Sequence, residues 1–383
     1  MPVASADVVV VGAGLIGLAI AWRTAQRGLT VTVLDPRPGS GASAAAAGML
    51  APVTELHYGE NALLTLNLAS SARFGAWSAE LLELTGRDIG YRRCGTVVAA
   101  WDAADLAALR DLQAFQNDLG LDAELLTSRQ LRELEPAVAP GLPGGLLAAG
   151  DHQVDPVGLH TALHEAGTAA GVRWRRHRAV AAVVGGGAVT GVDLDNGEHI
   201  ACGRLVLAGG AWIRELAGLP PEVLPPVRPV KGQTLHLRSD SAGLIGHVVR
   251  GSVRGSPVYL VPRDDGRVVV GASSEEVGFD TRPRAGAVYE LLRDAQTLLP
   301  QVSELHLEHV ATGLRPGSPD NAPIIGPTEM AGLVVAGGHF RNGVLLTPIT
   351  GDAVAEVLAD GTVPAELRAF SPQRFAVASP SPG

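Results

Sequence analysis

The stretch that decides the fold reads DVVVVGAGLIG and occupies residues 7–17. Its four consecutive valines indicate a buried strand, and the glycines that follow indicate a tight turn. Helical spacing then runs from about Leu15 to Arg27, Gly28 ends the helix, and a second apolar stretch follows at residues 30–34. We therefore expect a strand, a helix and a second strand that form one βαβ unit.

The three glycines of this turn have the spacing of a dinucleotide-binding fingerprint. Gly12 permits the tight turn, Gly14 lets the backbone approach a pyrophosphate, and Gly17 lets the helix pack closely on the strand. The amino end of the helix then faces the phosphates. Asp35 ends the second strand about 20 residues further on, where a carboxylate accepts hydrogen bonds from ribose hydroxyls. The pattern predicts a bound dinucleotide and does not distinguish FAD from NAD.

The composition fits a globular protein of two or three domains. The chain has 383 residues, of which 46% are hydrophobic and 18% charged, and domains typically have roughly 100–200 residues. A formal charge of -9 and the lack of a basic run argue against nucleic-acid binding. Cys94 and Cys202 have no CxxC spacing, which argues against zinc or a disulfide framework and suits a reducing cytoplasm. The sequence shows no secretion signal and no membrane-spanning stretch of ~20 apolar residues, so we expect a cytoplasmic protein.

After the βαβ unit, helical and strand patterns follow in blocks. The turn signals DNG at residues 195–197 and DDG at residues 264–266 predict hairpins. The strand-rich blocks around them predict an antiparallel sheet, distinct from the parallel N-terminal one, in an α/β (α+β) protein. We expect helices at residues 61–85, between 101 and 132, at 156–170, at 284–299 and from about Thr350, and strands at residues 96–100, 179–184, 189–193, 199–202, 205–208, within 231–272 and at 333–336, with a crossing between domains at residues 137–145.

Two further features allow more than one interpretation. The run SGASAAAAGMLAP at residues 40–52 either lets backbone lie close to a flat ligand or forms a tight helix packing face, and composition does not decide between them. His160 and His164 share a helix face at metal-ligand spacing. No glutamate lies between them, however, so a solvated surface pair is favoured over a zinc site.

Several later motifs occur in the order found in the D-amino acid oxidase family of FAD-dependent oxidoreductases, and the chain resembles that family over nearly its whole length apart from the tail. Within the family it is most similar to the glycine oxidases of thiazole synthesis for thiamine. It departs in having Asp35 where many relatives have Glu and in the loop before Tyr259. The motifs are LAGGAW at 207–212, KGQ at 231–233, YLVPR at 259–263, TGLRP at 312–316 and GGHFRNG at 337–343.

The resemblance implies non-covalently bound FAD, because neither Cys94 nor Cys202 lies in the late flavin-facing motifs. It implies a discontinuous Rossmann-like FAD-binding domain at residues 1–88, 145–228 and 300–375, a substrate-binding domain at 89–144 and 229–299, and a flexible tail at 376–383. The implied cofactor-binding residues are Gly12, Gly14, Leu15, Ile16, Gly17, Asp35, Pro36, Arg37, Ser43, Ala44, Gly48, Met49, Leu50, Val180, Gly209, Gly210, Trp212, His339, Phe340, Arg341, Asn342, Gly343, Val344 and Leu345.

The resemblance also implies three substrate-binding and catalytic residues. A guanidinium holds a carboxylate through two parallel charged hydrogen bonds, and Arg315 is the candidate for that clamp. Tyr259 would reach the same carboxylate, and Arg341 would lie near the substrate and flavin. From the residues alone, a salt bridge that secures the loop before Pro316 is favoured for Arg315. A core tyrosine bonded to backbone competes for Tyr259, and Arg341 is equally explained by an ion-pair anchor.

The implied reaction is oxidative deamination of glycine by O2, with hydride transfer to the flavin and hydrolysis of the imine. The alternatives are a D-amino acid or sarcosine oxidase or dehydrogenase of the same family, and a non-catalytic flavin-binding subunit. The presence of both Arg315 and Arg341 argues against a subunit, because a scaffold needs no carboxylate clamp. Relatives suggest a homo-oligomer, either a dimer or a tetramer.

Overall fold

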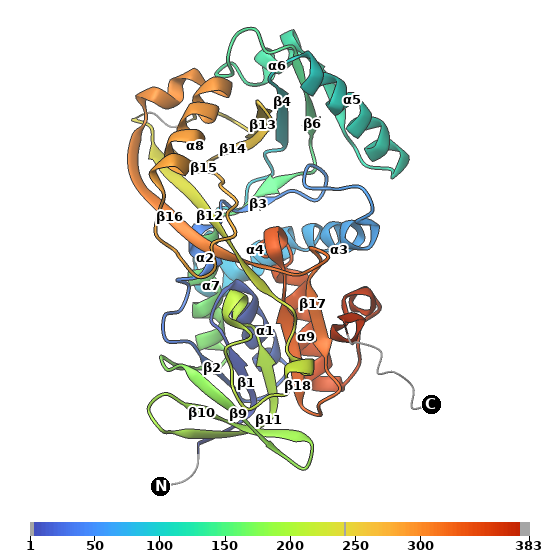
Figure 1. The fold of residues 1–383 in the computed structure, drawn as a ribbon, viewed down its shortest axis with the longest axis vertical. Coiled ribbons are helices and arrows are strands. Elements are labelled where there is room, and N and C mark those ends of the chain that lie inside the picture. The colour runs from blue at the N-terminus through green and yellow to red at the C-terminus, as the bar shows by residue number, and fades with distance from the viewer. Residues whose placement is uncertain (1–3, 241–242, 376–383) are drawn as a thin grey trace.

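The structure is a computed structural model, which describes residues 4–240 and 243–375. Two large sheets, one above the other in Figure 1, dominate it. The tail expected at residues 376–383 lies outside the described residues.

The first sheet is built around β1 (Ala4–Val11), which pairs in parallel with β2 (Val31–Leu34) and β11 (His199–Leu207). The predicted βαβ unit is confirmed, with α1 (Leu15–Gln26) between the two strands. The two short strands expected at residues 199–208 are one strand, β11. The remaining strands of this sheet are β8 (Arg173–Arg175), β9 (Ala179–Gly185), β10 (Ala188–Leu194), β17 (Ile324–Pro327) and β18 (Leu333–Gly337).

Both faces of β1 are buried, which explains the unbroken run of valines. Val8 and Val10 pack into a core with α1, α7 (Pro156–Ala169) and α9 (Thr347–Asp360). Val9 points the other way, into a core made with the antiparallel strands β9 and β10. The single helix expected at residues 61–85 is instead two helices, α3 (Asn61–Ser71) and α4 (Phe74–Thr85).

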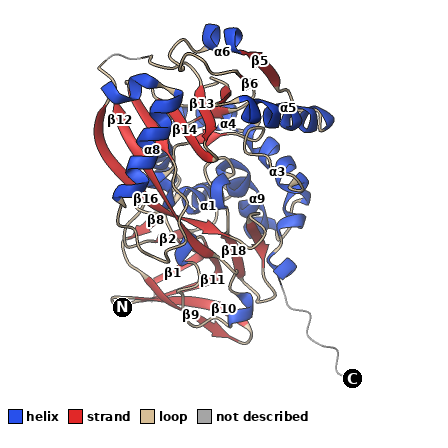
Figure 2. Ribbon diagram, turned by 45° about the horizontal axis from the view of Figure 1, so that its top comes forward, coloured by secondary structure: helices blue, strands red, loops and turns tan. Residues whose placement is uncertain are grey.

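The second sheet is mostly antiparallel and contains one of the two predicted hairpins, the turn at residues 264–266 between β14 (Ser256–Pro262) and β15 (Arg267–Gly271). The other turn, at residues 195–197, joins β10 to β11 in the first sheet, so the expectation that both strand-rich blocks form a separate sheet was wrong: β11 pairs with β1 on one edge and with β10 on the other. One pair, β4 with β13, is parallel, because a long excursion of the chain separates the two strands. Figure 2 shows α8 (Ala285–Leu298) lying over this sheet, and α5 (Ala103–Asp118) and α6 (Ser128–Leu134) lie at its far end. Its strands are, in spatial order, β16 (His306–Gly317), β12 (Arg228–Arg238), β15 (Arg267–Gly271), β14 (Ser256–Pro262), β13 (Val248–Val253), β4 (Thr96–Ala100), β6 (Gly144–Ala148) and β5 (Glu124–Thr127).

The small-residue run lies where the two sheets meet. Its short helix α2 (Ala42–Ala45) packs on β16, and a Cβ added to Gly313 would lie 2.8 Å from Cβ of Ala45. After it, β3 (Met49–Leu50) pairs with β7 (His152–Gln153). The strands β6 and β16 fall in ranges assigned to the FAD-binding domain but pair in the second sheet, and the domain division itself stays a prediction.

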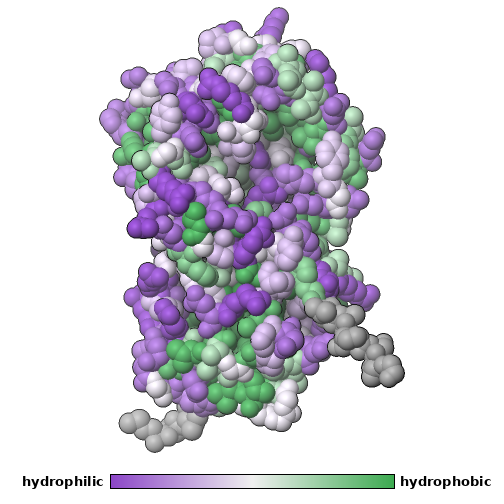
Figure 3. Space-filling view, viewed as in Figure 1, coloured by the Kyte–Doolittle hydropathy of each residue, from purple (hydrophilic) through white to green (hydrophobic). Residues whose placement is uncertain are grey.

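On the face drawn in Figure 3, hydrophilic side chains cover the middle of the molecule and apolar ones gather toward its lower end. Among the described residues, no helix is both long and apolar enough to cross a membrane. The cytoplasmic location expected from the sequence stays a prediction.

Candidate active site

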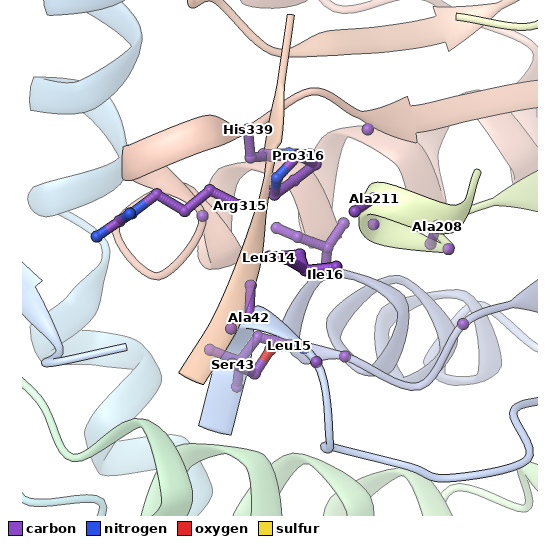
Figure 4. Close-up of a pocket in the computed structure, with 18 of the residues that line it drawn as sticks. Leu15, Ile16, Ala42, Ser43, Ala208, Ala211, Leu314, Arg315, Pro316 and His339 are labelled. Atoms are coloured by element: carbon purple, nitrogen blue, oxygen red, sulfur yellow. Dashed lines mark hydrogen bonds between the residues drawn. The ribbon is translucent and has the colours of Figure 1, made fainter. Parts of the chain in front are cut away.

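A cavity of ≈ 520 Å³ runs between the two sheets. It begins at the turn after β1, passes under α2 and β16, and ends beside Tyr259 and Arg315 of the second sheet; Figure 4 labels Arg315. A volume in this range suits one organic ligand of substantial size. Residues of the fingerprint turn, the small-residue run and the late motifs all line this one cavity.

The nucleotide end is organised by Asp35 and the turn after β1. The backbone N–H of Ala13 donates to Oδ2 of Asp35 at 2.8 Å, and that of Arg37 donates to Oδ1 at 2.8 Å. Gly12 has a φ of +109°, and a Cβ there would lie 2.4 Å from the carbonyl oxygen of Ala208. Asp35 and Ala208, which lie far from the turn in the sequence, therefore fix its backbone conformation.

The turn leaves room for a ligand at Gly14. A Cβ added there would meet only Oγ of Ser43, at 3.4 Å. Ser43 in turn accepts a hydrogen bond from the N–H of Leu15 at 3.2 Å, and Gly14 supplies no side-chain cap to α1. Ser43 accepts from one N–H group at this helix end, and the amino end of a helix attracts anions, so these residues fit a bound pyrophosphate.

The loop after β18 lies against the middle of the cavity. His339 to Leu345 all line it, and Phe340 has a φ of +46°, which is strained for a residue with a side chain. The loop leads directly into α9, so the positive end of that helix faces the cavity. A positive helix end at this place would stabilise an electron-rich ring bound in the cavity.

Arg315 and Tyr259 form the far end of the cavity. In Figure 4, Arg315 extends from β16 away from Ile16 and Ala208. Its guanidinium lies against Gly232, where a Cβ would come within 2.3 Å of Nη1, and Nη1 donates to the carbonyl oxygen of Ser273 at 3.1 Å. Burial raises the pKa of the Tyr259 hydroxyl, and the adjacent Arg315 opposes that shift through its charge and a hydrogen bond.

A buried carboxylate, Glu55, lies at the same end, and sequence reasoning missed it. Its Oε1 lies 2.5 Å from Nη2 of Arg250, and its Oε2 lies 3.6 Å from Nε of Arg341. Burial alone would raise the pKa of Glu55, but the two arginines outweigh burial and hold that pKa below its ordinary value. The only sequence signal was that Glu55 is the first charged residue after Arg37.

Comparison with known proteins agrees with this geometry. The sequence pattern of the DAO family, described as FAD dependent oxidoreductase, matches residues 7–357. The chain belongs to this family. Its fold is also that of a solved family member, the glycine oxidase of Geobacillus kaustophilus, with a TM-score of 0.90, 33% identity and coverage of 97% of this chain and 99% of the other.

Curated relatives carry related names. The bifunctional protein ThiO/ThiG of Synechocystis sp. is 36% identical over 97% of this chain, and the match covers 54% of the relative. The chain thus spans about half the length of the curated bifunctional relatives that it matches. The hydrogen cyanide synthase subunit HcnC of Pseudomonas aeruginosa is 30% identical over 96% of each chain.

In this FAD-dependent oxidoreductase, the structure brings together most of the residues singled out in the sequence. Gly17, Ala44 and Leu50 do not line the cavity: Gly17 packs on the carbonyl oxygen of Gly12, Ala44 is exposed and Leu50 is buried. Their predicted cofactor contacts, like those of the other residues, stay a prediction. The predicted residues that line the cavity are Gly12, Gly14, Leu15, Ile16, Asp35, Pro36, Arg37, Ser43, Gly48, Met49, Val180, Gly209, Gly210, Trp212, Tyr259, Arg315, His339, Phe340, Arg341, Asn342, Gly343, Val344 and Leu345.

The interpretation of His160 and His164 as a solvated pair was wrong. Nε2 of His160 lies 2.9 Å from the carbonyl oxygen of Ala13, in the fingerprint turn, and the His160 ring packs on Gly39. His164 stacks on Trp174 with 4.4 Å between ring centroids. Both rings are half-buried with protein partners. Within residues 4–240 and 243–375, no group of three His, Cys, Asp or Glu side chains is placed to hold a metal ion.

His339 should make the stability of the fold pH-dependent. The side chain is 2% exposed, and burial lowers its pKa to about 3, while an unfolded histidine titrates near 6.5. Below pH 6.5 the unfolded chain binds a proton that the folded chain excludes, so stability is lost as the pH falls. Between pH 7 and pH 5 the loss from one such histidine is about 2 kcal/mol.

We therefore expect His339→Gln to reduce the difference in free energy of unfolding between pH 7 and pH 5 by about 2 kcal/mol. Urea denaturation at both pH values, with the same saturating FAD, measures it. His306→Gln, at a side chain that is 70% exposed, is the control and should keep the wild-type difference. A His339 variant with the wild-type difference would show that this ring titrates normally.

Proposed function

We propose that the protein is a glycine oxidase, which converts glycine, O2 and water to glyoxylate, ammonia and hydrogen peroxide with non-covalently bound FAD. The observation that carries the proposal is the pairing of Arg315 with Tyr259 at the end of the cavity opposite the nucleotide turn. A guanidinium and a hydroxyl side by side suit a carboxylate, and glycine is among the smallest molecules that offer a carboxylate next to an oxidisable carbon.

Bound FAD supplies the acceptor for a hydride from the substrate α-carbon, and O2 takes up the electrons as hydrogen peroxide. The residues of the chain contribute alignment. Arg315 fixes the carboxylate in distance and angle, and Tyr259 restricts its rotation, so that the α-carbon is held against the loop of His339 to Leu345. The lining by Met49, Leu314 and Pro316 excludes water from the space between them.

The proposal that FAD is bound without a covalent bond rests on the positions of the two cysteines. Cys202 is buried in the core between β11 and β10, and burial raises its thiol pKa to about 11. Cys94 packs against the same buried cluster as Met49 and Tyr259 but does not line the cavity. Acid precipitation should therefore release all yellow colour into the supernatant.

The names of two relatives support the proposed metabolic role and the proposed substrate. A relative called ThiO/ThiG supports a role in supplying the thiazole of thiamine, and a relative called glycine oxidase supports the substrate. The expected homo-oligomer, a dimer or tetramer, remains part of the proposal.

Anaerobic addition of glycine to the yellow holoprotein tests the proposal. We expect the flavin absorbance to bleach, and air to restore it with one equivalent of hydrogen peroxide per turnover. Bleaching by sarcosine or a bulky D-amino acid and not by glycine would favour a sibling oxidase. Bleaching that air fails to reverse would indicate a dehydrogenase, and no bleaching with any amine would indicate a flavin-binding subunit.

A further inference from the structure

Glu55 lies in the cavity as one anion among three guanidinium groups. Its side chain is 14% exposed, and its two oxygens face different arginines, Arg250 behind the cavity wall and Arg341 within the cavity. The contact with Arg250 is short, at 2.5 Å. The contact with Arg341, at 3.6 Å, is an ion pair without a hydrogen bond. Glu55 therefore shares its one negative charge between the two arginines and offsets part of the charge of each.

The surroundings of Glu55 fix it in this position. The fully buried carboxylate of Asp151 accepts hydrogen bonds from the N–H groups of Val53 and Thr54, at 2.9 and 2.8 Å, and from the Thr54 hydroxyl at 2.7 Å. Arg250 also donates to the Thr54 hydroxyl at 3.2 Å, and it lies directly opposite Tyr259 in the pairing of β13 with β14. The segment that carries Glu55 is thus tied to the strand that carries Tyr259.

The two arginines that line this end of the cavity, Arg315 and Arg341, differ in whether they already have a carboxylate partner. Arg315 donates to a backbone carbonyl, and among the described residues it has no carboxylate within ion-pairing distance. Arg341 has Glu55, and its side chain is 32% exposed, so it stands at the open side of the cavity. Arg315 is the guanidinium that is free to bind a substrate carboxylate, and Arg341 is not.

We propose that Glu55 determines charge specificity: its single negative charge, shared between Arg250 and Arg341, offsets part of the charge that Arg341 offers to a ligand, and so favours monocarboxylates over ligands with a second carboxylate. This inference rests on the proposed function and names the substrate class of the same site. A second carboxylate entering beside Arg341 would be repelled by the negative charge of Glu55, which already occupies part of the positive field of Arg341. Removal of the Glu55 charge leaves Arg341 as a second anion site.

Ligand binding to the holoprotein tests this without turnover. Acetate, malonate and succinate are titrated, and dissociation constants are taken from the perturbation of the flavin absorbance. In the wild type we expect acetate to bind at least tenfold more tightly than either dicarboxylate. In Glu55→Gln we expect this ratio to fall by tenfold or more, and in the double variant Glu55→Gln, Arg341→Gln the wild-type ratio should largely return.

Glu165→Gln is the matched control, because Glu165 pairs with Arg87 at 2.7 Å outside the cavity and should leave the ratio unchanged. The inference is overturned if the wild type binds acetate and the dicarboxylates equally, a result that needs no variant, or if Glu55→Gln keeps the wild-type ratio. If Glu55→Gln loses its flavin, Glu55→Ala gives the same readout. If no carboxylate perturbs the flavin or competes with glycine, the proposed function itself fails.

Discussion

Replacement of Arg315 by alanine should lower kcat/KM for glycine by roughly thirtyfold to several thousandfold, mainly through KM. Loss of one partner from a desolvated charged hydrogen-bond pair costs on the order of 2–5 kcal/mol, and about 1.4 kcal/mol is a factor of ten. The guanidinium lies against Gly232 and beside Tyr259, with no carboxylate partner among the described residues to share it. Steady-state kinetics with glycine at fixed O2 measures the change.

Two further variants separate substrate binding from stability. Arg315→Lys keeps the charge but loses the planar fork, so its kcat/KM should fall between those of the wild type and the alanine variant. Arg228→Ala removes an exposed ion pair with Glu276 and a hydrogen bond to the carbonyl oxygen of Ser318, both outside the cavity, and should leave the kinetics unchanged. If Arg315→Ala has wild-type kinetics and normal flavin content, Arg315 does not bind the substrate.

The nucleotide half of the site was predictable because its signals are local. A valine run, spaced glycines and an acidic residue at the end of the next strand all lie within residues 7–35, and the structure has them in one βαβ unit. The physical demands on this unit, a buried strand and close helix packing, act on neighbouring residues. Local patterns therefore carry the information.

The strand that carries Arg315 gave no such signal. The first four residues of β16, His306 to His309, are exposed, and the strand contains two glycines and a proline, so no alternation of apolar and polar residues marks it. Its stability comes from pairing with β12 along its whole length. Arg315 was found only through the resemblance of the TGLRP motif.

Glu55 and His160 were missed or misread for a related reason. The role of Glu55 depends on its ion pair with Arg250, which lies 195 positions later in the chain. The role of His160 depends on its contact with the carbonyl oxygen of a residue 147 positions earlier. Nothing near either residue in the sequence indicates its partner. Such roles follow from tertiary contacts, which a single sequence does not display.

The small-residue run had two interpretations from its composition, and the structure shows both at once. Ala45 packs on Gly313 of β16 and also lines the cavity, and Gly48 lines the cavity while its backbone packs on the carbonyl oxygen of Val154. Small residues thus let other backbone segments approach closely and leave space for a ligand beside them. Composition alone does not show which segments approach.

Replacement of Gly14 by alanine should weaken FAD binding by about 1–3 kcal/mol, which is a factor of roughly 5 to 150, and leave the fold intact. The backbone at Gly14, with φ of -79°, accepts any residue, and the added Cβ meets only the Ser43 hydroxyl at 3.4 Å. The methyl group would instead occupy the space in which we place the pyrophosphate. Titration of the apoprotein with FAD, followed by flavin fluorescence, measures the dissociation constant.

Gly17→Ala is the contrasting variant, because a Cβ there would lie 1.9 Å from the carbonyl oxygen of Gly12. We expect that variant to lose stability even without FAD, since α1 can no longer pack on the turn. Gly14→Ala should keep the Tm of the wild-type apoprotein and lose only the rise in Tm that FAD produces. Wild-type affinity for FAD in Gly14→Ala would mean that the cofactor phosphates do not pass over this residue, and the placement of the nucleotide end would have to change.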